Sequence, residues 1–239
     1  TLHFSCFKPV GDQGKKWKLK ATLGDAHDIL SVKFAPSHLG LKLATCSNDG
    51  VVRIYEALDI TNLSQWQITD QFEVTDGDSK GTTCLAWNTA PFDASTIAVG
   101  TESSAPQIWQ HNEQLRKWEL IAVLGKDPSQ KEVVGHKDSI HDVAWAPNLG
   151  RSYHLVATAS RDRTAKIWRL EPNAKVKWSV KEVASFPDHN SEVWRVEWNV
   201  TGTILATSGD DGTVRLWKHS YQNDWQCLNV IASTCSVEN

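Results

Sequence analysis

The sequence has no methionine, few cysteines and no long apolar run. A membrane helix needs about 18 or more consecutive apolar residues, and no such stretch or secretory leader is present. The five cysteines are odd in number and contain no C-x-x-C pair, so we interpret them as reduced thiols in the cytosol or nucleus. Because even an initiator methionine is missing, we expect the chain to be a piece of a longer one.

An excess of one charge is also lacking. The chain has 25 Lys and Arg against 28 Asp and Glu, a formal net charge of -3. That balance does not predict a polyanionic partner. The short basic run Lys15–Lys20 alternates around Trp17 and Leu19 as a strand does, so we interpret it as a solvated strand face rather than a nucleic-acid site.

What the sequence does contain is a repeat. Three copies are clear: His27–Tyr55, His136–Trp168 and His189–Trp217. A fourth, Thr82–Trp109, is degenerate. The aromatic residues that close the copies are 54, 59 and 49 residues apart. Repeats near this period, built of short alternating strands, are typical of stacked four-stranded sheets that cannot bury their faces alone. The pattern predicts an all-β propeller, which is a binding scaffold.

The last copy shows how one blade is built. Glu192–Trp198 alternates in polarity and is predicted as the innermost strand, and Thr203–Ser208 follows it after a turn. Thr213–Trp217 and Trp225–Ile231 complete the four strands.

A second tryptophan marks the fourth strand of every copy. These residues lie 8 to 11 positions beyond the closing aromatic: Trp66, Trp118, Trp178 and Trp225. By the same logic Trp17–Leu23 is a fourth strand and Thr1–Phe7 the third strand before it. We therefore predict about four and a half blades in one domain over 1–239, comprising 1–23 (partial), 27–74, 82–124, 136–186 and 189–231, with a tail at 232–239.

The pattern resembles the WD-repeat family over nearly the whole chain. In that family a His before the first strand, a Ser/Thr in the second, an Asp in the next turn and a Trp in the third form a hydrogen-bonded set. The resemblance assigns three such tetrads here: His136, Thr158, Asp162 and Trp168; His189, Thr207, Asp211 and Trp217; and His27, Thr45 and Asp49 with Tyr55 in place of Trp. An orphaned buried member would cost about 1–3 kcal/mol.

The second copy departs from this pattern. It has no His before Thr82, an alanine at Ala98 and Glu102 in place of Asp; only Trp109 remains. We expect packing to hold this blade together and expect it to be the least rigid.

Neither catalysis nor cofactor binding is predicted. The Asp–His–Thr sets superficially suit a triad, but they recur at repeat spacing, whereas a catalytic set occurs once. No H-E-x-x-H, Cys/His metal spacing or phosphate-binding glycine loop is present. Trp194 and Arg195 begin an innermost strand and are the candidate partner contacts, since Trp and Arg are common interface anchors.

Several stretches are more specific than the generic repeat. Phe34–Trp66, Trp145–His154 and His189–Trp217 with Tyr221–Cys227 resemble the Seh-type nucleoporins of the nuclear pore Y-complex, including the loop Asp59–Trp66. The resemblance implies an open six-bladed propeller at the nuclear envelope. A helical nucleoporin inserts a blade in trans, and other Y-complex subunits bind as well. It also implies a second setting at the vacuolar or lysosomal surface, in a nutrient-signalling complex.

Two other readings remain open. A coat propeller of the Sec-thirteen type shares the architecture but resembles these loops less. A ubiquitin-ligase substrate receptor would need a W-D-x-R box, yet Trp168 is followed by Arg169 and Trp217 by Lys218. Relative to the family, about one and a half blades, or about 90 residues, are missing upstream.

Overall fold

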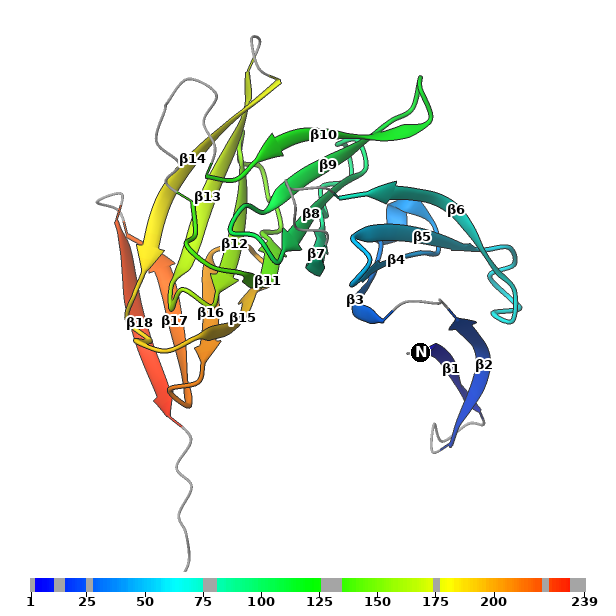
Figure 1. The fold of residues 1–239 in the computed structure, drawn as a ribbon, viewed down its shortest axis with the longest axis horizontal. Coiled ribbons are helices and arrows are strands. Elements are labelled where there is room, and N and C mark those ends of the chain that lie inside the picture. Colours follow the sequence, from blue (N-terminus) through cyan, green and yellow to red (C-terminus); the bar gives the residue numbers. More distant parts are fainter. Residues whose placement is uncertain are drawn as a thin grey trace, which may run out of the picture.

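The computed structural model of the chain is built almost wholly of β-strands (Figure 1). It describes residues 3–10, 16–24, 28–74, 81–125, 135–173, 177–220 and 224–232. In this part of the chain the only helical element is a short 3₁₀ turn, Ser37–Leu39. The described residues contain no helix long and apolar enough to cross a membrane.

The strands form four antiparallel sheets of four strands and one hairpin. The hairpin pairs β1 (His3–Val10) with β2 (Lys16–Gly24). The first full sheet contains β3 (Ile29–Phe34), β4 (Lys42–Ser47), β5 (Val51–Ala57) and β6 (Trp66–Glu73). The second contains β7 (Thr82–Trp87), β8 (Thr96–Thr101), β9 (Gln107–Asn112) and β10 (Lys117–Val123).

The remaining two sheets repeat the same order. The third contains β11 (Ile140–Trp145), β12 (His154–Ser160), β13 (Ala165–Asn173) and β14 (Lys177–Phe186). The fourth contains β15 (Val193–Trp198), β16 (Ile204–Gly209), β17 (Thr213–His219) and β18 (Trp225–Ala232). Below, these four sheets are called blades 1 to 4. The predicted all-β propeller class is confirmed, and the hairpin supplies the two strands expected ahead of blade 1.

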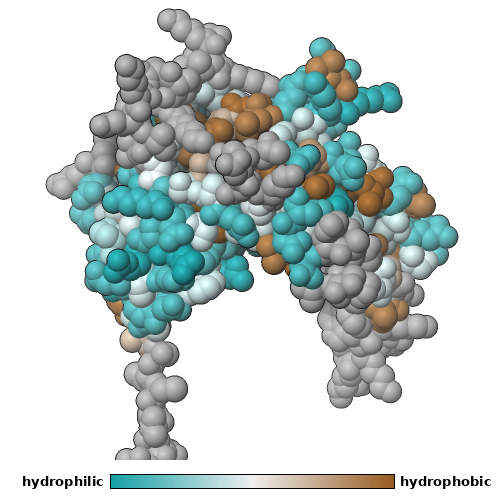
Figure 2. Space-filling view, viewed as in Figure 1, coloured by the Kyte–Doolittle hydropathy of each residue, from teal (hydrophilic) through white to brown (hydrophobic). Residues whose placement is uncertain are grey.

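Successive blades follow one another in an arc that begins with the β1–β2 hairpin and ends with blade 4 (Figure 1). The innermost strands of neighbouring blades touch in series, β3 with β7, β7 with β11 and β11 with β15. On the face seen in Figure 2, the coloured residues are mostly hydrophilic, with apolar patches between them.

The apolar core lies between the blades. Each of its three clusters joins two neighbours: Leu85 and Trp87 of blade 2 pack with Ile54 and Phe72 of blade 1, for example. The second cluster joins blades 2 and 3, and the third joins blades 3 and 4. A single sheet would leave these side chains in water, so the repeats stabilise one another.

A β-bulge recurs at one position in every blade. The second residue of each innermost strand has no partner in the ladder, and these residues are Leu30, Thr83, His141 and Trp194. An extra residue in one strand bends that strand and redirects a side chain. The fold therefore presents four equivalent side chains near the start of the innermost strands.

Candidate functional sites

The predicted residues of blade 3 meet around one hydroxyl. Thr158 Oγ1 lies 2.7 Å from His136 Nε2 and accepts a hydrogen bond from Trp168 Nε1 at 2.9 Å. His136 Nδ1 lies 2.9 Å from Asp162 Oδ2. With Nδ1 donating to the carboxylate, Nε2 accepts the threonine O–H, so one hydroxyl both donates and accepts. These hydrogen bonds connect four parts of the blade: the segment before β11, strand β12, strand β13 and the turn between β12 and β13.

Blade 4 repeats this geometry. Thr207 Oγ1 lies 2.8 Å from His189 Nε2 and accepts from Trp217 Nε1 at 2.9 Å. His189 Nδ1 lies 3.0 Å from both carboxylate oxygens of Asp211. Thr207 is 1% exposed. A hydroxyl sealed in this way has structural rather than chemical use, because no substrate can reach it.

The aspartates of both sets are held in their charged form. Burial alone would raise the pKa of Asp162, but hydrogen bonds from His136, Thr164 and the Lys137 N–H outweigh it and hold that pKa below its usual value. The pKa of Asp211 is lowered in the same way by His189 and Thr213. Stabilisation from such groups depends on their being ionised.

Blade 1 places its predicted residues differently. His27 lies outside the described residues, and Tyr55 is buried. Thr45 Oγ1 is buried and has no hydrogen-bond partner in the part of the chain that the structure describes. The Asp49 carboxylate instead accepts hydrogen bonds from Arg53 Nη2 and Ser47 Oγ, each at 2.7 Å. Burial alone would raise the pKa of Asp49, but these bonds lower it to about 2.

Aromatic packing connects blade 2 to its neighbour. With Ala98 in the hydroxyl position, the Trp109 indole donates instead to Gln107 Oε1 at 3.0 Å. Phe72 of blade 1 lies 4.7 Å from Trp109 and 5.2 Å from Trp118 between ring centroids. Such ring pairs add about 0.5–1.5 kcal/mol each beyond area burial. The greater mobility expected of this blade remains a prediction.

Trp194 lies at the bulge of β15 and is 44% exposed. Its ring stacks on His141, the bulge residue of blade 3, with centroids 4.1 Å apart and planes 14° apart. Its Nε1 donates to Asp210 Oδ1 at 2.7 Å. The Glu192 carboxylate lies next to this stack: its Oε2 is 3.2 Å from His141 Nε2, and its Oε1 accepts a hydrogen bond from Arg161 Nε at 3.3 Å.

The sequence did not predict this cluster, in which His141 and Asp210 contact Trp194 and Glu192 links His141 to Arg161. Its only signal is the shared position of His141 and Trp194 in two copies of the repeat, which becomes a contact once both strands bulge there.

Arg195 points mostly into water, with 73% of its side chain exposed. Its Nη1 lies 3.9 Å from Oδ1 of Asp142, a buried carboxylate on β11. Burial raises the pKa of Asp142, although the Val196 and Val143 N–H groups bond to it and Arg195 and Lys33 attract it. Asp142 thus joins two innermost strands, and Arg195 offsets part of its charge.

The described residues contain no cluster of three or more His, Cys, Asp or Glu side chains placed to bind a metal. Burial raises the pKa of the Cys46 thiol to about 12. The Cys84 thiol is also buried, and its pKa is raised for the same reason. Thiols in this state are poor nucleophiles.

The fold and its tetrads define a class of protein. The sequence pattern of the WD domain, G-beta repeat, matches residues 17–56, 128–169 and 180–218, leaving out the degenerate copy at Thr82–Trp109. The chain belongs to the WD-repeat family.

Within that family it is similar to the SEH1 nucleoporins. It is 44% identical over 232 residues to nucleoporin SEH1-A of Xenopus laevis. This match covers 90% of this chain and 60% of that protein. It is 43% identical over 240 residues to nucleoporin SEH1 of Homo sapiens, covering 93% and 62%, and 41% identical to that of Danio rerio. The chain thus spans about three fifths of the length of these relatives.

We predict that Thr158→Val destabilises the protein by about 1–3 kcal/mol, because it strands the Trp168 N–H and one His136 nitrogen in a buried site. Urea unfolding of the full-length protein, followed by tryptophan fluorescence, measures the change. Thr22→Val, at an exposed position of β2, is the matched control and should shift stability by less than about 0.5 kcal/mol. Equal effects of the two variants would contradict a stabilising role for the tetrad.

Acid should selectively remove the contribution of Asp162. Its pKa is lower in the folded chain, so its stabilisation is complete above the unfolded value of about 3.9 and is lost as pH falls toward the folded value. Asp162→Asn should therefore be less stable than wild type at pH 7, with the gap narrowing below about pH 4. Urea midpoints at several pH values measure this gap. Val156→Ala, a buried apolar change on β12, should keep a constant gap; a constant gap for Asp162→Asn would refute the prediction.

Proposed function

We propose that the protein is a non-catalytic scaffold subunit of the nuclear pore outer-ring Y-complex. The observation that carries the proposal is the 43–44% identity to SEH1 nucleoporins over 90–93% of the chain. In this proposal it works at the nuclear envelope by presenting blade edges and faces to other subunits, and its outcome is support of protein and mRNA transport through the pore.

We further propose that a helical nucleoporin completes the propeller with a blade of its own, and that other Y-complex subunits bind elsewhere on the scaffold. Blade 4 offers suitable chemistry for the inserted blade. Trp217 stacks on Phe186 of blade 3 at 4.0 Å, so Val214, three residues earlier on β17, faces the opposite way. Val214 pairs in register with Ile231 of β18, and they are 37% and 51% exposed.

The edge of β18 supports the same idea. In the described part of the chain β18 pairs only with β17, and Leu228, its bulge residue, is 54% exposed. An exposed apolar edge strand favours pairing with another strand, and strand addition turns that tendency into affinity. Trp194 and Arg195 remain proposed contacts for a second subunit, on the face where the innermost strands begin.

Affinity purification of the tagged full-length protein from its own cells, with mass spectrometry, tests the assignment. We expect Y-complex nucleoporins to co-purify. Recovery of only COPII-like coat subunits, or only subunits of a vacuolar or lysosomal complex that regulates TORC1, would keep the scaffold class and overturn the nuclear pore. Recovery of ubiquitin-ligase subunits would overturn the class.

The double variant Val214→Lys/Ile231→Lys tests the blade-completion step. Two buried ammonium groups would oppose an apolar partner face, so the recovery of the blade-donating nucleoporin should fall at least about tenfold. Val200→Lys, at an 88% exposed position in the turn after β15, is the matched control and should leave recovery unchanged. Undiminished recovery with the double variant would mean that the partner binds elsewhere.

A further inference from the structure

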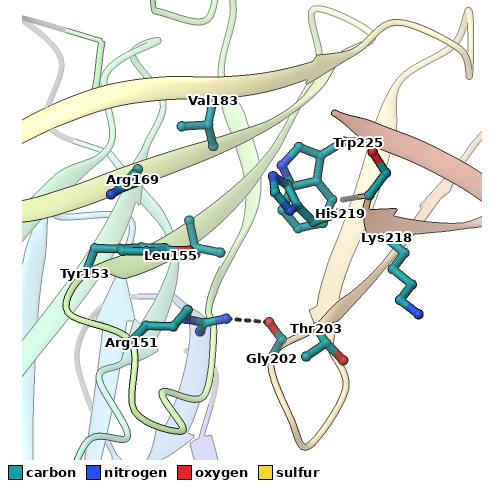
Figure 3. Close-up of a pocket in the computed structure, with 11 residues that line it drawn as sticks. Arg151, Tyr153, Leu155, Arg169, Val183, Gly202, Thr203, Lys218, His219 and Trp225 are labelled. Carbon is teal, nitrogen blue, oxygen red and sulfur yellow. Dashed lines mark hydrogen bonds between the residues drawn. The ribbon is translucent and has the colours of Figure 1, made fainter. Parts of the chain in front are cut away.

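A pocket of about 350 Å³ lies between blades 3 and 4 (Figure 3). One wall comes from residues 151–155, β13 and β14, and the other from the turn before β16, the end of β17 and the start of β18. We call it the interblade pocket. Its volume is at the lower end of the range for ligand sites, so it suits one or two side chains rather than a folded domain.

The two walls are held at a fixed separation. Arg151 Nη1 donates to Gly202 O at 2.8 Å across the blade boundary (Figure 3). Its Nη2 donates to Pro147 O at 2.7 Å. Gly202 has a φ of +63°, and a Cβ there would lie 2.3 Å from Pro147 O. Only glycine fits this contact, so the pocket is preformed.

The inner surface is apolar and aromatic. Leu155 and Val183 contribute from blade 3, and Trp225 lies opposite them (Figure 3). Tyr153 completes the surface, with the Arg169 guanidinium 3.8 Å from the centre of its ring. An aliphatic side chain fits such a lining better than a polar one.

Among the described lining residues, two carry a positive charge in the pocket, Arg151 and Arg169, and none is an Asp or Glu. His219 adds a ring nitrogen that can donate a hydrogen bond. Arg169 pairs with Glu171 through its Nε at 2.6 Å, outside the lining. Arg151 has no carboxylate partner among the described residues: its guanidinium donates only to carbonyl oxygens, and its Nε is buried without a partner there. Arg151 therefore places in the pocket a positive charge that no carboxylate among the described residues neutralises.

A nucleic acid fits this site poorly. Base binding needs free aromatic faces, but one face of Tyr153 is taken by Arg169. Trp225 is already surrounded by Trp198 at 5.8 Å, Phe186 at 6.5 Å and His219 at 5.4 Å.

We propose that the interblade pocket binds a short acidic segment of a partner protein, with an aliphatic side chain inside the pocket and carboxylates against Arg169 and His219, in the same pocket as the charge of Arg151. This site is separate from the exposed face of Val214 and Ile231, and it does not depend on which assembly recruits the protein.

A fluorescein-labelled peptide, Gly-Glu-Asp-Leu-Glu-Asp-Gly, is the probe, and its fluorescence anisotropy is measured with the full-length protein. Two matched peptides replace each acid by its amide, or the leucine by glycine. We expect each to bind at least about tenfold more weakly than the probe. We also expect binding of the probe to weaken as salt is added, since the cations lie partly in water.

The protein variant for the test is Arg169→Glu/His219→Glu, which should weaken probe binding at least about tenfold while its urea midpoint shows that it is folded. Arg116→Glu/Lys117→Glu reverses two exposed charges next to and within β10 and should change binding less than about twofold. The proposal fails if the probe does not bind, if the amide peptide binds as well, or if both variants behave alike. Displacement of the probe by an oligothymidine would also overturn it, in favour of a general polyanion site.

Discussion

Burial of blade faces against neighbouring blades is the constraint on which this structure depends. A four-stranded sheet has two faces, and here the inner side chains of one sheet are covered only by the next, as Ile54 and Phe72 are covered by blade 2. Hydrogen bonds add direction to this contact. Trp87 Nε1 donates to Lys33 O and Trp198 Nε1 to Ala144 O, each at 3.2 Å, from one innermost strand to the preceding one. Blades are thus aligned along the strand as well as packed.

The same constraint is met in two ways within single blades. Blades 3 and 4 use a buried threonine hydroxyl to satisfy an indole N–H and a histidine nitrogen, a network that gains from low dielectric surroundings only when every member is paired. Blade 2 lacks the hydroxyl, and Gln107 satisfies its indole while Phe72 fills the space beside it. Either solution gives the third-strand indole N–H (Trp109, Trp168 or Trp217) a partner, which explains why a degenerate repeat still forms four regular strands.

Most of the fold was predictable, because the repeat specifies it through local spacing. Strand β15 begins one residue from the predicted start, and β18 begins at Trp225 as expected. The His136 and His189 sets could be named because the resemblance to the WD-repeat family assigns them, and the structure brings their members into hydrogen-bond contact. The stack of His141 on Trp194 was not predictable, because it depends on a bulge in each of two strands and on the distance between blades.

The interblade pocket was equally hidden. Its walls come from residues 151–225 on two blades, and no short motif joins Arg169 to His219. The residues that form a blade are specified by the repeat, so they recur along the chain and can be predicted from the sequence. Residues that distinguish one propeller from another lie where the repeat makes no demand, in turns, strand ends and bulges.

This division also accounts for why the proposed binding surfaces concentrate on blade 4. Trp217 and His219 alternate with Val214 and Lys218 along β17, so one set of side chains packs toward blade 3 while the other faces away. The same short strand therefore contributes to the tetrad, to one wall of the pocket and to the exposed apolar face. No separate binding domain is needed for this: β17 fixes the architecture with one face, while Val214 on its other face stays partly exposed.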